Sequence, residues 1–304
     1  PLFLFIAGVS FPYSVAKQRA GGMSEGRIYA KIVRRGLTLV VLGMVYNGLF
    51  KLDFENLRIA SVLGRIGLAW SIAAVLYLNF GVKTRAAIAV AVLAGYGALS
   101  ALVAAPDAAG AGPLTFEGNL AGYIDRQFLP GKLIYGSFDP EGLLSTVPAV
   151  VTAMLGMFTG EFVRRGDIRG GRKTLWMAAA AAALLAAGLA FSGVLPVNKK
   201  LWSSTFVCVV GAYSLGMFAL FYYLIDVRRW RRWTLFFRVV GLNSITIYLA
   251  QRIVGFGRIS DFFLGGIASK CPEAVAVVIS SAGYVAVCWL FLYFLYRKNV
   301  FLKV

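Results

Sequence analysis

The residues best suited to chemistry in this sequence form a polar segment, LPVNKKLWSSTF at 195–206, which lies between two long apolar runs. The segment combines a proline, an asparagine, paired lysines, a tryptophan and three hydroxyl residues, whereas a connection between helices needs only polarity. One interpretation is that Asn198, Lys199 and Trp202 contact a ligand. The other is that Trp202 anchors the chain at an interface with water, while Ser203 or Ser204 caps the next helix.

Arg58 and Arg65 form a second group, because they lie seven residues apart at the start of the apolar run 59–80. On one helix this spacing puts both side chains on the same face, about 10 Å apart along the axis. An arginine at the centre of a membrane costs roughly 2.5 to 3.5 kcal/mol, so Arg65 needs an offsetting interaction. Snorkelling or a structural ion pair would supply it, and so would a bound phosphate or carboxylate.

A pair of carboxylates, Asp139 and Glu141, occurs in the string SFDPEGLL. In a structural role, Asp139 caps the following helix, Pro140 takes its first position and Glu141 favours its dipole. In a functional role, the two carboxylates hold an ammonium substrate or take its proton.

Polar residues also gather in the string GLNSITIYLAQR, near the middle of the apolar run 235–256. Asn243, Thr246 and Tyr248 cannot share one helical face, so some of them make hydrogen bonds between helices. With Gln251, they indicate a polar interior.

The elements that must position these residues are membrane helices. A mean hydropathy of +0.75 with 59% hydrophobic residues over 304 positions is too apolar for a soluble fold. The sequence predicts an all-α, polytopic transmembrane bundle of about nine helices in one domain, 1–304, with a short helix near Asn119–Phe128 and close packing at the GxxxG of Gly156 and Gly160. The apolar runs are 1–15, 33–50, 59–80, 86–104, 143–163, 175–193, 203–225, 235–256 and 274–296.

The excess of 31 basic over 13 acidic residues reports topology and not nucleic-acid binding, because most of the basic residues lie in alternate connections. These connections include the arginine-rich loops at 164–173 and 228–232 and the C-terminal residues Arg297, Lys298 and Lys303. The positive-inside rule places them in the cytoplasm and LPVNKK outside.

Three observations concern the start of the sequence, its cysteines and its lack of histidine. The sequence starts at Pro1 inside a short apolar run, so we expect an upstream helix and about ten spans in the intact protein. The three cysteines have no paired spacing, which predicts neither a disulfide framework nor a zinc site. These residues include no histidine, the commonest general base and metal ligand, so any histidine must lie upstream and no metal is expected.

At these residues the chain resembles the heparan-α-glucosaminide N-acetyltransferase family of transmembrane acyltransferases. Around Gln251 it departs from animal members, which have a histidine after the tyrosine of this helix. Six strings carry the resemblance, and they occur along the chain in the order expected of the family: PLFLFIAGVSF, LRIASVLGRIGLAW, NLAGYIDRQFLPG, DPEGLLSTVPAVVTAMLG, PVNKKLWSSTF and GLNSITIYLAQR.

The resemblance implies transfer of an acetyl group from cytoplasmic acetyl-CoA to the amine or hydroxyl of a saccharide outside, with a catalytic histidine just upstream of Pro1. Asp139 and Glu141 are then candidates for acid and base work, and Arg58 and Arg65 for binding donor phosphates. The remaining binding candidates are Asn198, Lys199, Trp202, Asn243, Tyr248 and Gln251, of which Asn198, Lys199 and Asn243 could supply oxyanion donors.

Two mechanisms stay open, direct transfer and an acetyl-histidine intermediate. The alternative function is a transporter or flippase for an anionic lipid or sugar. The expected partners are the lipid bilayer, acetyl-CoA and a saccharide acceptor, and a homodimer is implied only by the resemblance. The expected location is a bacterial inner membrane, with the C-terminus in the cytoplasm.

Overall fold

The computed structural model describes residues 1–302, so Lys303, which was counted with the basic connections, lies outside the described residues. Over these residues the chain forms twelve α-helices and no strand, which confirms the all-α fold class. The chain divides into two compact units, Pro1–Arg229 and Trp230–Val304. One acyltransferase-like domain over 1–304 stays a prediction.

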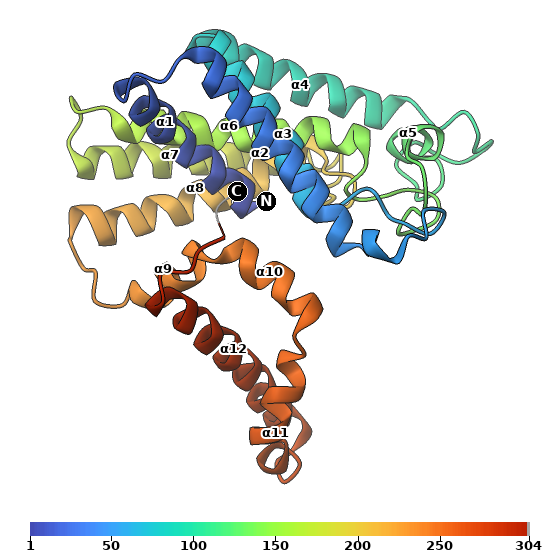
Figure 1. Ribbon diagram of the computed structural model, residues 1–304. Coiled ribbons are helices and arrows are strands. Elements are labelled where there is room, and N and C mark those ends of the chain that lie inside the picture. Colours follow the sequence, from blue (N-terminus) through green and yellow to red (C-terminus); the bar gives the residue numbers. More distant parts are fainter. Residues whose placement is uncertain (303–304) are drawn as a thin grey trace. The chain divides into compact units, whose positions relative to one another are not determined.

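The first unit consists of long helices whose longer connections, with one short helix, α5, gather at one end (Figure 1). The predicted helix near Asn119–Phe128 is confirmed as α5, and the Asn119 side chain caps it. The helices are α1 (Leu2–Ala20), α2 (Glu25–Tyr46), α3 (Val62–Asn79), α4 (Val82–Leu102), α5 (Leu120–Phe128), α6 (Leu143–Arg164), α7 (Gly170–Ala190) and α8 (Ser204–Tyr222).

We name the two ends of this unit by their connections. The α5 end contains the segments 47–61, 103–142 and 191–203, which include α5 and the 3-10 turn Leu49–Lys51. The arginine-rich end contains the segments 21–24, 80–81 and 165–169, together with the π-helical turn Tyr223–Val227. Helices α2, α3, α4, α6, α7 and α8 each run from one end to the other.

Six helices among the described residues are long and apolar enough to span a membrane: α3, α4, α6, α7, α8 with its π-helical turn, and α12. The chain is therefore an integral membrane protein. Helices α1 and α2 have 19 and 22 residues but fall outside this group. The charges of α2, which begins at Glu25 and not near residue 33, lower its apolar character.

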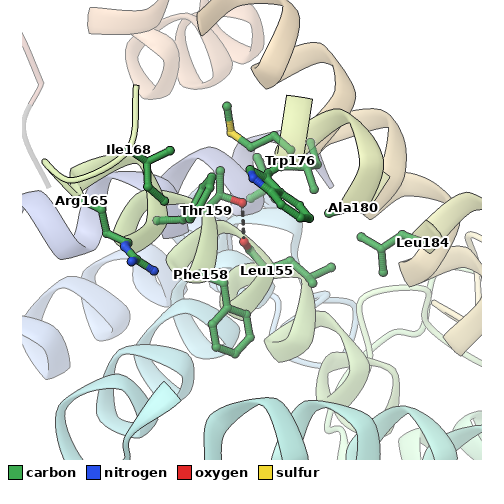
Figure 2. A pocket seen from close by; sticks show the side chains of 13 residues that line it. Leu155, Phe158, Thr159, Arg165, Ile168, Trp176, Ala180 and Leu184 are labelled. Atoms are coloured by element: carbon green, nitrogen blue, oxygen red, sulfur yellow. Dashed lines mark hydrogen bonds between the residues drawn. The ribbon is translucent and has the colours of Figure 1, made fainter. Parts of the chain in front are cut away.

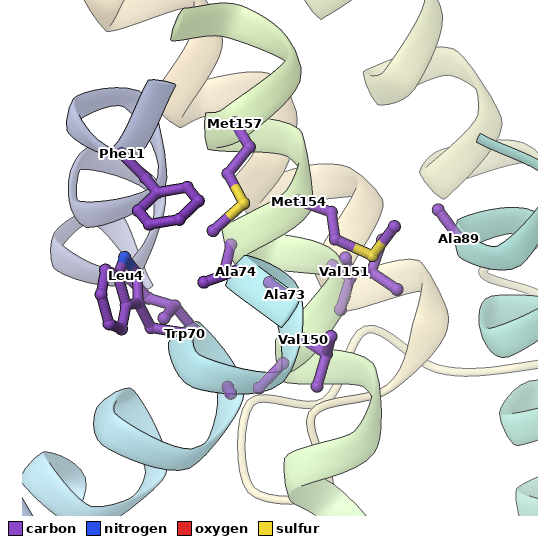
Figure 3. Close-up of a cluster of buried hydrophobic side chains, with 14 of the residues drawn as sticks. Leu4, Phe11, Trp70, Ala73, Ala74, Ala89, Val150, Val151, Met154 and Met157 are labelled. Atoms are coloured by element: carbon purple, nitrogen blue, oxygen red, sulfur yellow. The ribbon is translucent and has the colours of Figure 1, made fainter. Parts of the chain in front are cut away.

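Helix α6 lies at the centre of the unit and is mostly buried. Its Val151, Met154 and Met157 belong to a cluster with Trp70 of α3 and Phe11 of α1 (Figure 3). The close packing predicted for the GxxxG is confirmed, because a Cβ at Gly156 or Gly160 would meet the backbone of α1 at Phe5 or Val9. This rigid centre fixes where α6 begins, beside the carboxylate pair of the sequence.

The second unit contains α9 (Leu235–Leu242), α10 (Ser244–Ile253), α11 (Phe256–Ala268) and α12 (Glu273–Arg297), with α12 packed on α11. The run 235–256, predicted as one helix, is two helices. Asn243 separates them, with φ −124° and ψ 27°, outside the helical region. The apolar composition of the run did not reveal this break.

Candidate functional site

An ion-pair cluster at the α5 end joins three of the residues singled out in the sequence. Nε and Nη2 of Arg58 donate to the two carboxylate oxygens of Asp139, each at 2.6 Å, and Nη2 also donates to Glu141. The Asp139 side chain is fully buried and that of Arg58 is 19% exposed. Such a bidentate pair is stronger and more specific in geometry than a single contact.

Arg58 does not lie on a helix with Arg65, which corrects the expected shared face. It precedes α3, and its backbone forms an isolated bridge with Gly131, whose φ of +79° suits glycine. Burial alone would lower the pKa of Arg58, but the hydrogen bonds and charges of Asp139 and Glu141 outweigh it and hold that pKa above its ordinary value. Arg58 is therefore a permanent cation.

The structural role expected of Asp139 was wrong, because Asp125 of α5 takes it. Oδ1 of Asp125 accepts from the N–H of Leu143, the first residue of α6, and Oδ2 accepts from the N–H of Asp139. Pro140 precedes the helix, whose N-cap is Gly142. Asp139 is thus left to bind Arg58, with its Oδ1 also accepting from the backbone of Glu141.

Asp125 is fully buried, and sequence reasoning missed it. Burial raises its pKa to about 6, against the opposing effect of the two backbone N–H donors. The signal in the sequence was an acidic residue on the face of a short amphipathic helix that also carries Ala121 and Gly122, both buried.

Arg65 lies in the first turn of α3 and is 4% exposed. Its Nη2 donates to the Pro140 carbonyl and the Ser145 hydroxyl, and its Nε donates to Thr146 at 3.4 Å. No acidic side chain pairs with it directly, and Nη1 is buried without a partner among the described residues. A buried cation with an unused donor is suited to an anion or a developing oxyanion.

Trp202 covers Arg65, and this corrects the anchoring interpretation of that residue. Its indole ring lies 4.7 Å from the guanidinium carbon and is buried in the core. The backbone of Trp202 has φ +52°, a left-handed conformation that is uncommon for a bulky residue. The surrounding turn supports it, since Ser203 N–H donates to the Asn198 carbonyl. Such strain is often found at functional sites.

The other residues of the polar segment divide between structure and surface. The Asn198 side chain accepts from the N–H groups of Lys200 and Leu201, so it shapes the turn. The predicted cap by Ser203 is confirmed by its bond from Phe206 N–H. Lys199 is exposed, and its charge acts on the Pro1 nitrogen together with that of Arg65. Residue 1 is therefore within electrostatic range of Lys199 and Arg65.

Three predicted residues lie in the second unit, and they are not assigned to this cluster. Asn243 is 1% exposed, and its Oδ1 accepts from Thr246 at 3.2 Å. Gln251 hydrogen-bonds the Cys288 thiol of α12. Tyr248 lies on α10, one turn from each of them.

The cluster at the α5 end thus contains two arginines and three carboxylates around the start of α6. It can bind an anion at Arg65, hold a polar or cationic group at Glu141, and exchange a proton near neutral pH at Asp125. Within residues 1–302 no group of three or more histidine, cysteine or acidic residues could hold a metal ion.

No family model matches the chain. Curated relatives do: the heparan-alpha-glucosaminide N-acetyltransferase of Homo sapiens is 27% identical over 361 aligned positions, and that of Mus musculus is 25% identical over 358. The alignments cover this whole chain but 53% and 54% of the relatives, so the chain spans about half their length. The resemblance carried by the sequence strings is confirmed: this integral membrane protein is similar to two heparan-alpha-glucosaminide N-acetyltransferases.

Proposed function

We propose that the chain is a membrane-embedded acetyltransferase that moves an acetyl group from acetyl-CoA to the amine or hydroxyl of a saccharide. Similarity over the whole chain to two N-acetyltransferases supports the reaction type. In this proposal the arginine-rich end faces the cytoplasm, because loops rich in Lys and Arg stay there. The acceptor then enters at the α5 end.

The main structural support for the proposal is Arg65, because it is a buried cation with an unused hydrogen-bond donor. Attack on a thioester places negative charge on the carbonyl oxygen, and a preorganised donor in a water-poor site stabilises that charge. The Nη1 of Arg65 has no partner among the described residues, while its other nitrogens are held by Ser145, Thr146 and Pro140. The guanidinium is therefore oriented before any ligand arrives.

The carboxylates have separate roles in this proposal. Glu141 faces the cluster from the α5 end, where it would orient an amine or hydroxyl acceptor. Asp139 and Arg58 hold Glu141 in place. A histidine just upstream of Pro1, as the resemblance implies, would lie within range of the Lys199 and Arg65 charges and serve as the base or carry the acetyl group.

The direct test is acetyl transfer by the purified full-length protein in lipid nanodiscs. Radiolabelled acetyl-CoA is supplied with glucosamine-terminated saccharides, and labelled saccharide and free CoA are measured. We expect both products in equal amounts. Binding of the saccharide with neither acetyl transfer nor CoA release would favour the transporter instead.

Arg65→Lys tests the role of the guanidinium. Lysine keeps the charge but cannot place a second nitrogen at the position of Nη1. We expect kcat to fall by about 10² to 10³, the loss typical of an oxyanion donor. The matched control is Arg126→Lys at the same end, where Arg126 pairs with Asp107 near the surface. Equal activity of both variants would remove Arg65 from the mechanism.

A further inference from the structure

A cavity lies in the first unit near its arginine-rich end, away from the cluster around Arg65. It has a volume of about 660 Å³ and is formed mainly by α6, α7 and the connection between them, with one residue from α1 and two from α8. Helix α6 packs mainly on α1, and α7 packs mainly on α8, so these two helices contact each other little. Figure 2 shows Trp176, Ala180 and Leu184 of α7 beside Leu155 and Phe158 of α6.

The interior of this cavity is apolar. Its one hydroxyl, on Thr159, donates to the Leu155 carbonyl within α6 at 2.8 Å (Figure 2). Water needs two or more polar partners to occupy a cavity, and apolar cavities stay dry. A hydrocarbon chain is therefore the favoured occupant, and lipid is the solvent around these helices.

The cavity length fits one leaflet. Its α7 wall runs from Trp176 to Leu184, about 12 Å along a helix axis. Half of a hydrocarbon core is about 15 Å thick. One acyl chain of a lipid in the leaflet at the arginine-rich end would therefore extend along the whole length of this wall.

The charge beside the cavity selects the headgroup. Residues 164–173 contain five basic residues and one acidic residue, Asp167. Arg165, which lies at the cavity rim in Figure 2, is already paired with Asp167 at 2.6 Å. Arg172 is exposed and lies four residues before Trp176, so it continues the same face of α7 towards water, and the exposed Arg169 is the N-cap residue just before the helix.

We propose that this cavity binds one acyl chain of an anionic phospholipid, whose phosphate is bound by Arg169 and Arg172. The α7 face changes from basic to apolar within about one turn, as a phospholipid changes from headgroup to chain. The site is independent of the acetyltransferase proposal, because it shares no residue with the Arg65 cluster.

The test is native mass spectrometry of the full chain released from vesicles of phosphatidylglycerol and phosphatidylcholine. We expect retained phosphatidylglycerol on the native chain and about 30-fold weaker retention for R169Q/R172Q. The control R27Q/K83Q removes the same charge from the same end, on helices that do not line the cavity, and should retain the lipid. Equal loss from both variants, or retained phosphatidylcholine in place of phosphatidylglycerol, would overturn the headgroup assignment.

A second pair of variants tests the chain-binding cavity. Ala180→Phe fills it, whereas Ala179→Phe changes a neighbouring exposed residue that does not line it. We expect Ala180→Phe to lose the retained lipid and Ala179→Phe to keep it, at equal far-UV circular dichroism. If Ala180→Phe retains phosphatidylglycerol like the native chain, the acyl chain does not occupy this cavity.

Discussion

The arginines of the α5 end and those of the segment 165–173 at the arginine-rich end are used in opposite ways. At the α5 end, Arg58 and Arg65 are buried or nearly so and are held by specific oxygen atoms. At the arginine-rich end, Arg165, Arg169 and Arg172 are exposed, and Asp167 pairs only with the first. Exposed arginines cost little and report topology, whereas buried arginines are expensive and report a site.

The two ion pairs also differ in how far apart their partners lie in the sequence. Asp139 contacts Arg58 in the folded chain although 81 positions separate them in the sequence. Asp167 is two residues from Arg165. A long-range pair constrains the fold, while a local exposed pair does not, so substitutions at the two ends should differ strongly.

The largest expected difference is between Arg58→Met and Arg165→Met. Methionine keeps much of the side-chain volume but removes the charge, which leaves Asp139 buried with its main partner gone. We expect Arg58→Met to destabilise the protein by about 3 to 5 kcal/mol, and Arg165→Met to have little effect because that pair is fully exposed. Thermal unfolding in detergent, followed by tryptophan fluorescence, measures both. Equal midpoints would show that burial does not strengthen the cluster.

A smaller difference is expected between Gly142→Ala and Gly171→Ala, which add one methyl group at the start of α6 and α7. A Cβ at Gly142 would meet the Asp125 carboxylate, whereas one at Gly171 meets nothing within 4 Å. Gly142 has φ −67°, so backbone strain does not enter. We expect a loss of about 1 to 3 kcal/mol for Gly142→Ala and a neutral or slightly stabilising effect for Gly171→Ala. The same unfolding assay checks both, and an unchanged Gly142→Ala would mean that Asp125 can move aside.

The sequence predicted the helices of the first unit well, because lipid imposes length and apolar composition on every span. It also singled out Arg58, Arg65, Asp139 and Glu141, which the structure brings into one cluster, since charge next to apolar runs is costly. It did not predict their pairing, because Arg58 meets Asp139 only after α3 and α6 have packed. Asn243 was placed inside a helix for a similar reason: composition does not reveal where backbone geometry breaks.

Asp125 was missed because its role depends on contacts that no local pattern encodes. Its partners are the backbone N–H groups of Asp139 and Leu143, 14 and 18 residues away. An aspartate in a short helix is ordinary in composition. Its burial, which makes it informative, follows only from the packing of α5 against the start of α6.

The smallest expected effect is a change of stability with pH that comes from Asp125 at the α5 end. The pKa of Asp125 is about 6 in the folded chain against an ordinary 3.8, so the folded state binds this proton more tightly than the unfolded state does. Its contribution to stability is complete below about pH 4 and is lost as the pH rises through 6, a change of about 1 kcal/mol between pH 5 and 7.

Comparing Asp125→Asn with Asp167→Asn isolates this contribution. Arg165 holds the pKa of Asp167 below its ordinary value, so that group favours folding at high pH, and the effect is lost only at pH values below the range 5 to 7. We expect the unfolding midpoint of the native chain and of Asp167→Asn to fall similarly from pH 5 to 7, and that of Asp125→Asn to fall less. Asparagine keeps one acceptor oxygen but turns an amide donor towards the second N–H, so this variant should also be less stable overall. Parallel pH profiles for all three proteins would mean that the carboxylate beneath the Arg58 cluster does not titrate in this range.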